Sequence, residues 1–82
     1  MNSTEIFDRV QRIFRQVFED NAIQLEKNTT AKDIRGWDSF NHMNLIMTLE
    51  EEFQTKFSLG EVQSLKNVGD ILGLLEKKKK GA

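Results

Sequence analysis

A serine that directly follows an aspartate is the residue of this sequence best placed to do chemistry. Asp38 and Ser39 stand where a polar loop ending at Gly36 meets a long segment, residues 39–53, that contains neither Gly nor Pro. This segment predicts a helix, and the unpaired backbone N–H groups and the dipole at a helix start favour a negative group. The position therefore suits a phosphate esterified to the Ser39 hydroxyl.

Ser39 also has simpler interpretations. Serine is favoured as a helix N-cap, and Asp38 is a second candidate for that cap. His42, the single histidine, follows one helical turn after Ser39, so a Ser–His hydrolase is conceivable. Such a nucleophile also needs an orienting group and an oxyanion hole, and a domain this small offers no evident substrate pocket. We therefore predict no enzyme activity and no catalytic residue.

The composition limits the class of protein. The 82 residues are predicted to form a single domain over residues 1–82, and without cysteine its stability must come from helix packing. The formal net charge is −1, and no apolar run approaches the ~18 residues that read as a membrane span. These properties predict a cytoplasmic protein that binds neither nucleic acid, nor membrane, nor metal. Any thiol chemistry would need a thiol supplied by a cofactor.

The spacing of apolar residues predicts an all-α domain with three main helices and one short helix. The first helix is expected from residue 3 or 4 to residue 19, and the second from Ser39 to residue 54 or 55. A capping box, Ser58–Glu61, opens a short helix that ends at about Ser64. Residues 67–70 repeat the same cap pattern and open the last helix.

A long connection, residues 20–37, separates the first two helices. A loop of this length in a compact domain is unusual unless it has contacts of its own or a function. Four apolar residues are expected to hold it against the core: Ile23, Leu25, Ile34 and Trp37. At the other end of the chain, residues 76–82 include the run Lys77–Lys80 and are expected to form a frayed basic tail.

The motif around the serine and the order of the helices resemble the acyl carrier protein family. Asp38-Ser39-Phe40 matches the family's Asp-Ser-Leu, and residues 45–53 match its hydrophobic helix that ends in acidic residues and Phe. The resemblance covers nearly the whole chain and implies a four-helix bundle with a long first loop. It also implies that Ser39 carries a 4′-phosphopantetheine arm derived from coenzyme A, whose thiol holds acyl groups as thioesters. Asp38 would then help the modifying enzyme to recognise the site, and His42 would be a partly packed surface residue or a neighbour of the arm.

The resemblance also implies partners for a monomeric carrier. These are a phosphopantetheinyl transferase and enzymes that load and process the acyl or aminoacyl group. Asn41 and Asn44 stand where strongly acidic members carry carboxylates, so electrostatic steering toward the standard fatty-acid enzymes should be weaker. We therefore expect a specialised discrete carrier in a fatty-acid-like, polyketide or other specialised pathway. The alternative left open is a cofactor-free helical protein-interaction module.

A further set of residues is expected to border a partner surface or an acyl cavity. The second helix has more apolar positions than one core seam needs, and flexible Met side chains suit surfaces that accept several partners. In the family, acidic residues on this helix meet basic patches on partner enzymes. The simpler alternative is that the apolar members are core and the glutamate is solvated. The expected set is Phe40, Met43, Met47, Glu50, Val62 and Leu65.

Overall fold

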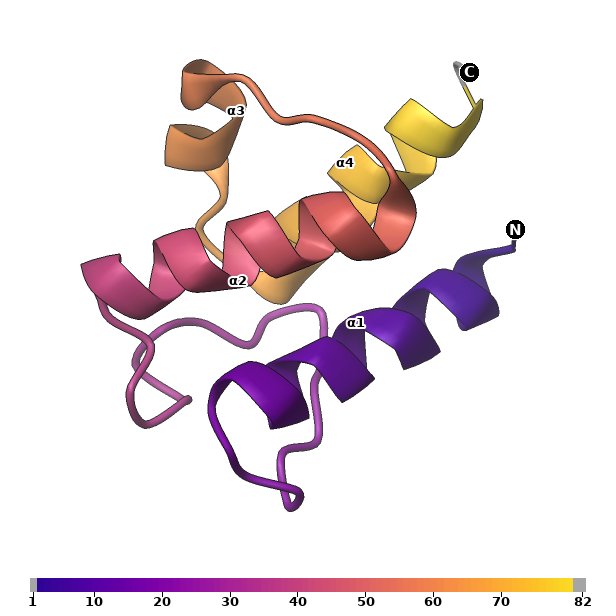
Figure 1. Cartoon of the computed structure of the whole chain (residues 1–82). Coiled ribbons are helices and arrows are strands. Elements are labelled where there is room, and N and C mark those ends of the chain that lie inside the picture. Colours follow the sequence, from indigo (N-terminus) through magenta and orange to yellow (C-terminus); the bar gives the residue numbers. More distant parts are fainter. Residues whose placement is uncertain (1, 81–82) are drawn as a thin grey trace.

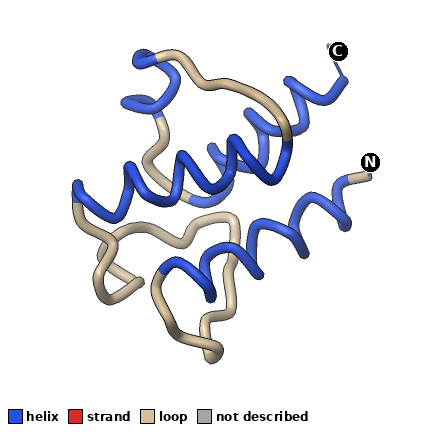
Figure 2. The backbone as a smooth tube through the Cα atoms, in the orientation of Figure 1, coloured by secondary structure: helices blue, strands red, loops and turns tan. Residues whose placement is uncertain are grey.

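The described part of the chain, residues 2–80, is a bundle of four helices and a long loop, with side chains described as far as residue 79. The structure is a computed structural model. In Figures 1 and 2, α1 and α2 lie side by side and run in opposite directions, α4 passes behind α2, and α3 stands beside α2. The predicted all-α fold is confirmed. The helices are α1 (Ser3–Val17), α2 (Ser39–Phe53), α3 (Leu59–Ser64) and α4 (Val68–Lys80).

The hydrophobic core lies among α1, α2 and α4, where each helix contributes one apolar stripe. This is the arrangement that apolar residues at helical spacing predict, because each stripe is removed from water only against another helix. None of the helices formed by residues 2–80 is long and apolar enough to cross a membrane. The buried residues of these three helices are Ile6, Val10, Ile13 and Phe14 in α1; Leu45, Ile46, Leu49 and Phe53 in α2; and Val68, Ile71, Leu72 and Leu75 in α4.

The first helix ends at Val17, before the predicted Glu19, because the chain turns into a left-handed conformation. Glu19 has φ +52°, and the Asp20 N–H donates to the Arg15 carbonyl at 3.0 Å while the Glu19 N–H donates to Gln16 at 3.3 Å. This pair of bonds closes a helix end that glycine usually makes. Because the residue at this position is a glutamate and not a glycine, the sequence pattern does not indicate that the helix ends here.

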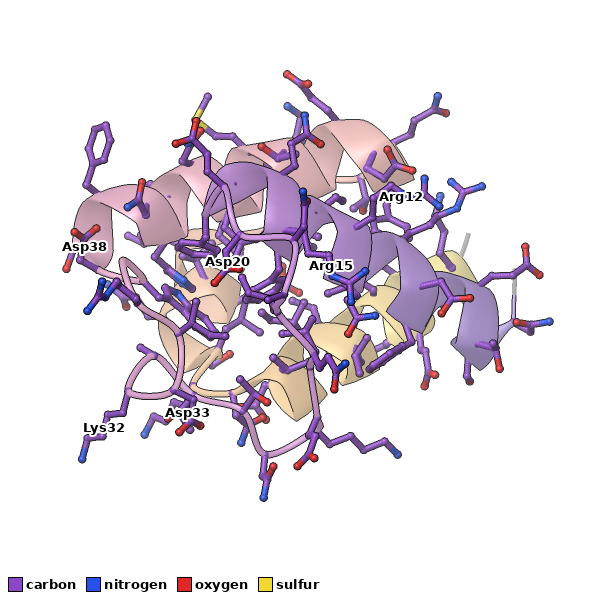
Figure 3. The ribbon with its side chains drawn as sticks, turned by 90° about the horizontal axis from the view of Figure 1, so that it is seen from below. Arg12, Arg15, Asp20, Lys32, Asp33 and Asp38 are labelled. Carbon is purple, nitrogen blue, oxygen red and sulfur yellow. The ribbon has the colours of Figure 1, made fainter. Side chains whose placement is uncertain are left out.

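Polar side chains of α1, as well as apolar anchors, hold the long loop in place. Ile23, Leu25, Ile34 and Trp37 are buried, as predicted. Arg15 lies beside the loop in Figure 3, and its Nε donates to the Ile23 carbonyl at 2.8 Å. The Leu25 N–H donates to the Gln11 side-chain oxygen at 2.8 Å. These bonds satisfy loop backbone groups that would otherwise be buried without partners.

The short helix α3 begins with the predicted capping box. The Ser58 hydroxyl accepts from the Glu61 N–H at 3.2 Å, and the Glu61 carboxylate accepts from the Ser58 N–H at 2.8 Å. The Ser58 N–H, and after it the Lys78 ammonium, hold the pKa of the Glu61 carboxyl below its usual range. Because the folded pKa is depressed, this stabilisation is present above the unfolded pKa and is lost as pH falls through the lowered value.

The basic tail predicted at residues 76–82 is helical as far as Lys80. Lys78 Nζ lies 3.0 Å from Glu61 Oε1 and 5.6 Å from the centroid of the Phe57 ring. Both contacts are favourable for a cation, so Lys78 links α4 to α3 and to the segment before it. Residues 81–82 lie outside the described residues, and fraying of the tail stays a prediction.

Two glycines of α4 should respond differently to alanine. A Cβ on Gly73 would meet nothing within 4 Å, whereas a Cβ on Gly69 would lie 3.0 Å from the Lys27 carbonyl oxygen. We expect Gly73→Ala to raise the free energy of unfolding by about 0.5–1 kcal/mol, because alanine is the better helix former. Gly69→Ala should gain less or destabilise. Urea titration compares the two variants, and equal stabilisation would contradict the close approach of the loop to Gly69.

Candidate functional site

The start of α2 gives Asp38 and Ser39 different roles. Asp38 is the N-cap, because its backbone is extended and its carboxylate accepts from the Asn41 N–H at 2.9 Å. Ser39 is the first residue of the helix and its side chain is exposed. The interpretation of Ser39 as the cap is therefore wrong, since the neighbouring carboxylate makes that bond. Within residues 2–80 the Ser39 hydroxyl has no hydrogen-bond partner.

A tight turn before α2 presents these residues. Gly36 has φ +89°, a conformation that glycine adopts without steric cost. Its carbonyl accepts from the Asp38 N–H at 2.9 Å and from the Asn41 side-chain amide at 2.7 Å. Asn41 therefore ties the turn to the helix by two bonds, one from its backbone and one from its side chain. A carboxylate at this position can only accept, so an acidic residue could not make the second bond.

Asn41→Asp should destabilise the protein, even though strongly acidic carriers have a carboxylate at this position. The variant loses the bond to Gly36 and brings a carboxylate close to a carbonyl oxygen. We expect the free energy of unfolding to fall by about 1–2 kcal/mol. Asn44→Asp adds the same charge at an exposed position of α2 where the side chain makes no hydrogen bond within residues 2–80. Urea titrations of the two variants should differ; equal values would show that charge alone is responsible.

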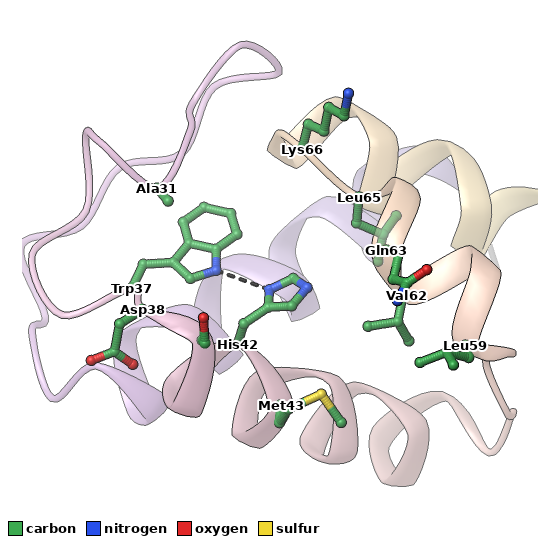
Figure 4. A pocket seen from close by; sticks show the side chains of 11 residues that line it. Ala31, Trp37, Asp38, His42, Met43, Leu59, Val62, Gln63, Leu65 and Lys66 are labelled. Atoms are coloured by element: carbon green, nitrogen blue, oxygen red, sulfur yellow. Dashed lines mark hydrogen bonds between the residues drawn. The ribbon is translucent and has the colours of Figure 1, made fainter.

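Trp37 joins this turn to the core beneath it. Trp37 is 8% exposed, and its ring packs edge-on against Phe14 with ring centroids 5.2 Å apart. Its Nε1–H donates to His42 Nδ1 at 3.0 Å, and the two ring planes are inclined by 23° with their centroids 6.0 Å apart (Figure 4). An indole N–H only donates, so Nδ1 is the acceptor in this bond and the ring proton is on Nε2.

This hydrogen bond argues against a Ser–His hydrolase. A catalytic histidine donates from Nδ1 to an orienting acceptor and takes the serine proton on Nε2. Here Nδ1 is the acceptor and Nε2 already carries the proton, so the ring cannot act as the general base for Ser39. No hydrogen bond joins Ser39 to His42 in the described part of the chain.

A groove of about 660 Å³ opens beside Ser39, between the end of the long loop, the start of α2, and α3 (Figure 4). Ser39 and Asp38 line one end. Most of its remaining wall is apolar and comes from Ala31, Trp37, Met43, Leu59, Val62 and Leu65. Because its volume lies within the range of ligand pockets in proteins, the groove is large enough to shelter a flexible organic group.

The structure brings only part of the predicted site together. Asp38, Ser39, Met43, Val62 and Leu65 all line the groove, with the last two across from α2 as expected. The groove is also lined by six residues outside the predicted set: Ala31, Trp37, His42, Leu59, Gln63 and Lys66. Leu59 could have been predicted from the sequence. It lies three residues before Val62, and this spacing places both side chains on one face of the helix.

The other three predicted residues lie outside the groove. Phe40 is 80% exposed and Met47 is 58% exposed, so neither is core. Glu50 is half-buried, and its carboxylate accepts from the Phe57 N–H at 2.8 Å. This bond attaches the segment that joins α2 and α3 to the side of α2. A partner-binding role for these three residues stays a prediction.

Residues 8–75 match the family described as phosphopantetheine attachment site. The chain belongs to the acyl carrier protein family. It is 34% identical to the acyl carrier protein of Thermosynechococcus vestitus over 79 residues, which cover 95% of this chain and 96% of that one. It is 31% identical to the acyl carrier protein of Thermotoga maritima over 74 residues, 90% of this chain and 91% of that one.

A solved structure gives the same assignment. The solution NMR structure of the holo acyl carrier protein from Geobacter metallireducens matches with a TM-score of 0.84 and 53% sequence identity, over 89% of this chain and 84% of that one. The bundle is therefore of the acyl carrier protein type. The function is that of a phosphopantetheine-dependent carrier, which holds acyl groups and is not itself a catalyst.

The start of α2 fits the phosphopantetheine group of an acyl carrier protein. The Ser39 hydroxyl is exposed and makes no hydrogen bond within residues 2–80. The backbone N–H groups of Ser39 and Phe40, at the helix start, also have no partner there, and such groups suit a phosphate. The apolar groove begins at the same residue. In the described part of the chain, no group of three or more His, Cys, Asp or Glu side chains is placed to hold a metal ion.

Proposed function

We propose that Ser39 is the residue of this acyl carrier protein that carries the phosphopantetheine arm. One observation carries the proposal: Asp38 caps α2, which leaves an exposed Ser39 hydroxyl at the helix start and at the end of an apolar groove. The family match over residues 8–75 supports it, because Ser39 lies within the matched region.

Attachment is a transfer to the Ser39 oxygen. A phosphopantetheinyl transferase would hold coenzyme A so that this oxygen attacks the phosphorus bearing the pantetheine. The new O–P bond forms, the pyrophosphate bond breaks, adenosine bisphosphate leaves, and the serine proton passes to a base of the transferase. The exposed Asp38 carboxylate would help the transferase to position a metal ion and coenzyme A.

Once attached, the arm supplies a thiol that carries acyl or aminoacyl groups as thioesters. The chain itself has no cysteine and so cannot supply that thiol. Its own residues would hold the phosphate at the start of α2 and shelter the arm against Met43, Val62 and Leu65. The flexible tether raises the effective concentration of the cargo at each partner's site.

We further propose a specialised discrete carrier: a monomeric, cytoplasmic single domain of residues 1–82. Its partners would be a phosphopantetheinyl transferase and acyl-loading and acyl-processing enzymes. Asn41 and Asn44 give this face of α2 fewer carboxylates than strongly acidic carriers have, so steering by charge is weaker. The bond from Asn41 to Gly36 is a structural reason for an amide at position 41. Both points favour a dedicated set of partners.

Met43→Glu should weaken partner binding more than it changes stability. Met43 is 49% exposed and lines the groove, so a charge there meets water in the free protein and an apolar partner in a complex. With the transferase as partner, we expect the specificity constant for modification to fall about tenfold or more. The free energy of unfolding should change by less than about 0.5 kcal/mol. Gln16→Glu, on an exposed position of α1, is the control; an unfolded Met43→Glu would place Met43 in the core.

Intact-mass measurement tests the proposed attachment. The unmodified chain is incubated with coenzyme A and a broad-specificity phosphopantetheinyl transferase, with a parallel sample lacking coenzyme A. The proposal predicts a mass gain of one arm in the complete mixture alone. A cofactor-free interaction module predicts no gain in either sample. Peptide mapping of the product then shows whether the added mass is on Ser39 or elsewhere.

A further inference from the structure

The imidazole of His42 lies in the wall of the groove, where Gln63 and Lys66 are further polar residues beyond the Asp38–Ser39 end. Its Nδ1 accepts from Trp37 Nε1 at 3.0 Å, which leaves the ring proton on Nε2. Figure 4 shows Nε2 on the side of the ring away from Trp37, toward Val62 and Gln63. Within residues 2–80 this nitrogen has no hydrogen-bond partner. His42 therefore offers a ligand in the groove an N–H donor whose direction is set by the bond from Trp37.

We propose that His42 is a positioning residue for the phosphopantetheine arm. Its Nε2–H would donate to a hydroxyl or amide carbonyl oxygen in the half of the arm nearer the serine, and so hold the arm in the groove. This inference rests on the proposed attachment at Ser39. It assigns to His42 a defined donor role that a merely packed surface histidine would not have.

The position of His42 selects the arm rather than the cargo as the acceptor. His42 lies one turn after Ser39, and residues at this spacing have Cβ atoms about 5–6 Å apart. An arm that leaves Ser39 along the groove passes this ring before it reaches α3. Pantetheine has a hydroxyl and an amide carbonyl in that half, whereas the cargo begins beyond the thiol at the far end.

Trp37 is needed for this donor to have a fixed direction. An imidazole without a partner at Nδ1 divides between two tautomers and can rotate, so only part of the population would present a proton at Nε2. Trp37 is itself buried against Phe14, with ring centroids 5.2 Å apart. A chain of contacts therefore runs from the core through Trp37 and His42 to the groove.

The first test uses the unmodified protein. Two-bond proton–nitrogen NMR correlations of the single histidine report which ring nitrogen carries the proton. The proposal predicts a proton on Nε2 in the wild type and a mixture of tautomers in Trp37→Phe, which keeps an aromatic ring but has no N–H. A wild-type ring protonated on Nδ1, or an unchanged pattern in Trp37→Phe, would overturn the proposal.

The second test measures shielding of the arm thiol in the phosphopantetheinylated protein. The chain contains no cysteine, so an aromatic disulfide reagent reports on the arm alone. We expect His42→Phe to raise the rate of thiol reaction about two- to tenfold, the range set by the loss of one hydrogen bond. His42→Gln, whose side-chain amide has an N–H at similar reach, should restore most of the shielding. Equal rates in all three proteins would refute the positioning role.

Two controls separate the possible failures. Intact mass is measured before each rate: absence of the added arm in the wild type refutes the proposed attachment, whereas full modification with equal rates refutes only the role of His42. The Nε2 resonance is then followed on attachment of the arm and again on acylation. A change on attachment supports the arm as acceptor, and a change only on acylation would reassign the donor to the cargo and overturn the proposal. Urea titration confirms that each variant is folded.

Discussion

Ser39→Ala should abolish the mass gain from phosphopantetheinylation while the bundle stays nearly as stable as the wild type. Modification stops because the attacking oxygen is gone and the chain has no cysteine to replace it. Stability should change by no more than about 0.5 kcal/mol, because Asp38 caps α2 and the exposed hydroxyl makes no hydrogen bond within residues 2–80. Intact mass after incubation with transferase and coenzyme A gives the first result, and urea titration the second.

Variants of Asp38 separate the role of the helix cap from the role of the Ser39 hydroxyl. Asp38→Ala removes the cap and should cost about 0.5–2 kcal/mol, whereas Asp38→Asn keeps a good capping side chain and loses only the charge. Asp38→Asn should therefore remain stable and be modified more slowly than the wild type. A mass gain retained in Ser39→Ala would show that another residue carries the arm. An unfolded Ser39→Ala would show that the serine is mainly structural.

Phe14→Ala should cause the largest loss of stability. Phe14 is fully buried, and its ring contacts those of Trp37 and Phe18 at centroid distances of 5.2 and 5.7 Å. Truncating such a side chain costs about 3–5 kcal/mol through lost burial and the cavity left behind. A domain of 82 residues has a total stability of about 4–12 kcal/mol, so the variant should be close to unfolding.

The same substitution should disturb the functional site, because Phe14 lies beneath Trp37. Trp37 is the single tryptophan, so its fluorescence during urea titration reports on the turn that presents Ser39. Phe40→Ala is the matched control: it removes the same ring from a position that is 80% exposed and should change stability by less than about 0.5 kcal/mol. A cost below about 1 kcal/mol for Phe14→Ala would contradict the packing described for this residue.

Local patterns in the sequence predicted most of the helical framework. The spacing of apolar residues correctly indicated helices α1, α2 and α4, because the spacing of side chains along a helix follows from backbone geometry alone. The capping box at Ser58 was correct because its two bonds join residues three apart in the chain. The end of α1 was predicted too late in the chain. Glu19 adopts the left-handed conformation that usually requires a glycine, so the sequence pattern did not indicate the helix end.

The sequence by itself therefore determined the helices, their buried faces, the place of the serine at the start of α2 and the resemblance to the carrier family. Each of these depends on residues within one or two turns of one another. Only the tertiary structure decided that Trp37 holds His42 in one tautomer, that Gln11 and Arg15 secure the long loop, and that Leu59 and Val62 face Ser39 across a groove. Those contacts depend on the path of a long loop and on the placement of α3 beside α2, and such placement is set by packing between distant segments.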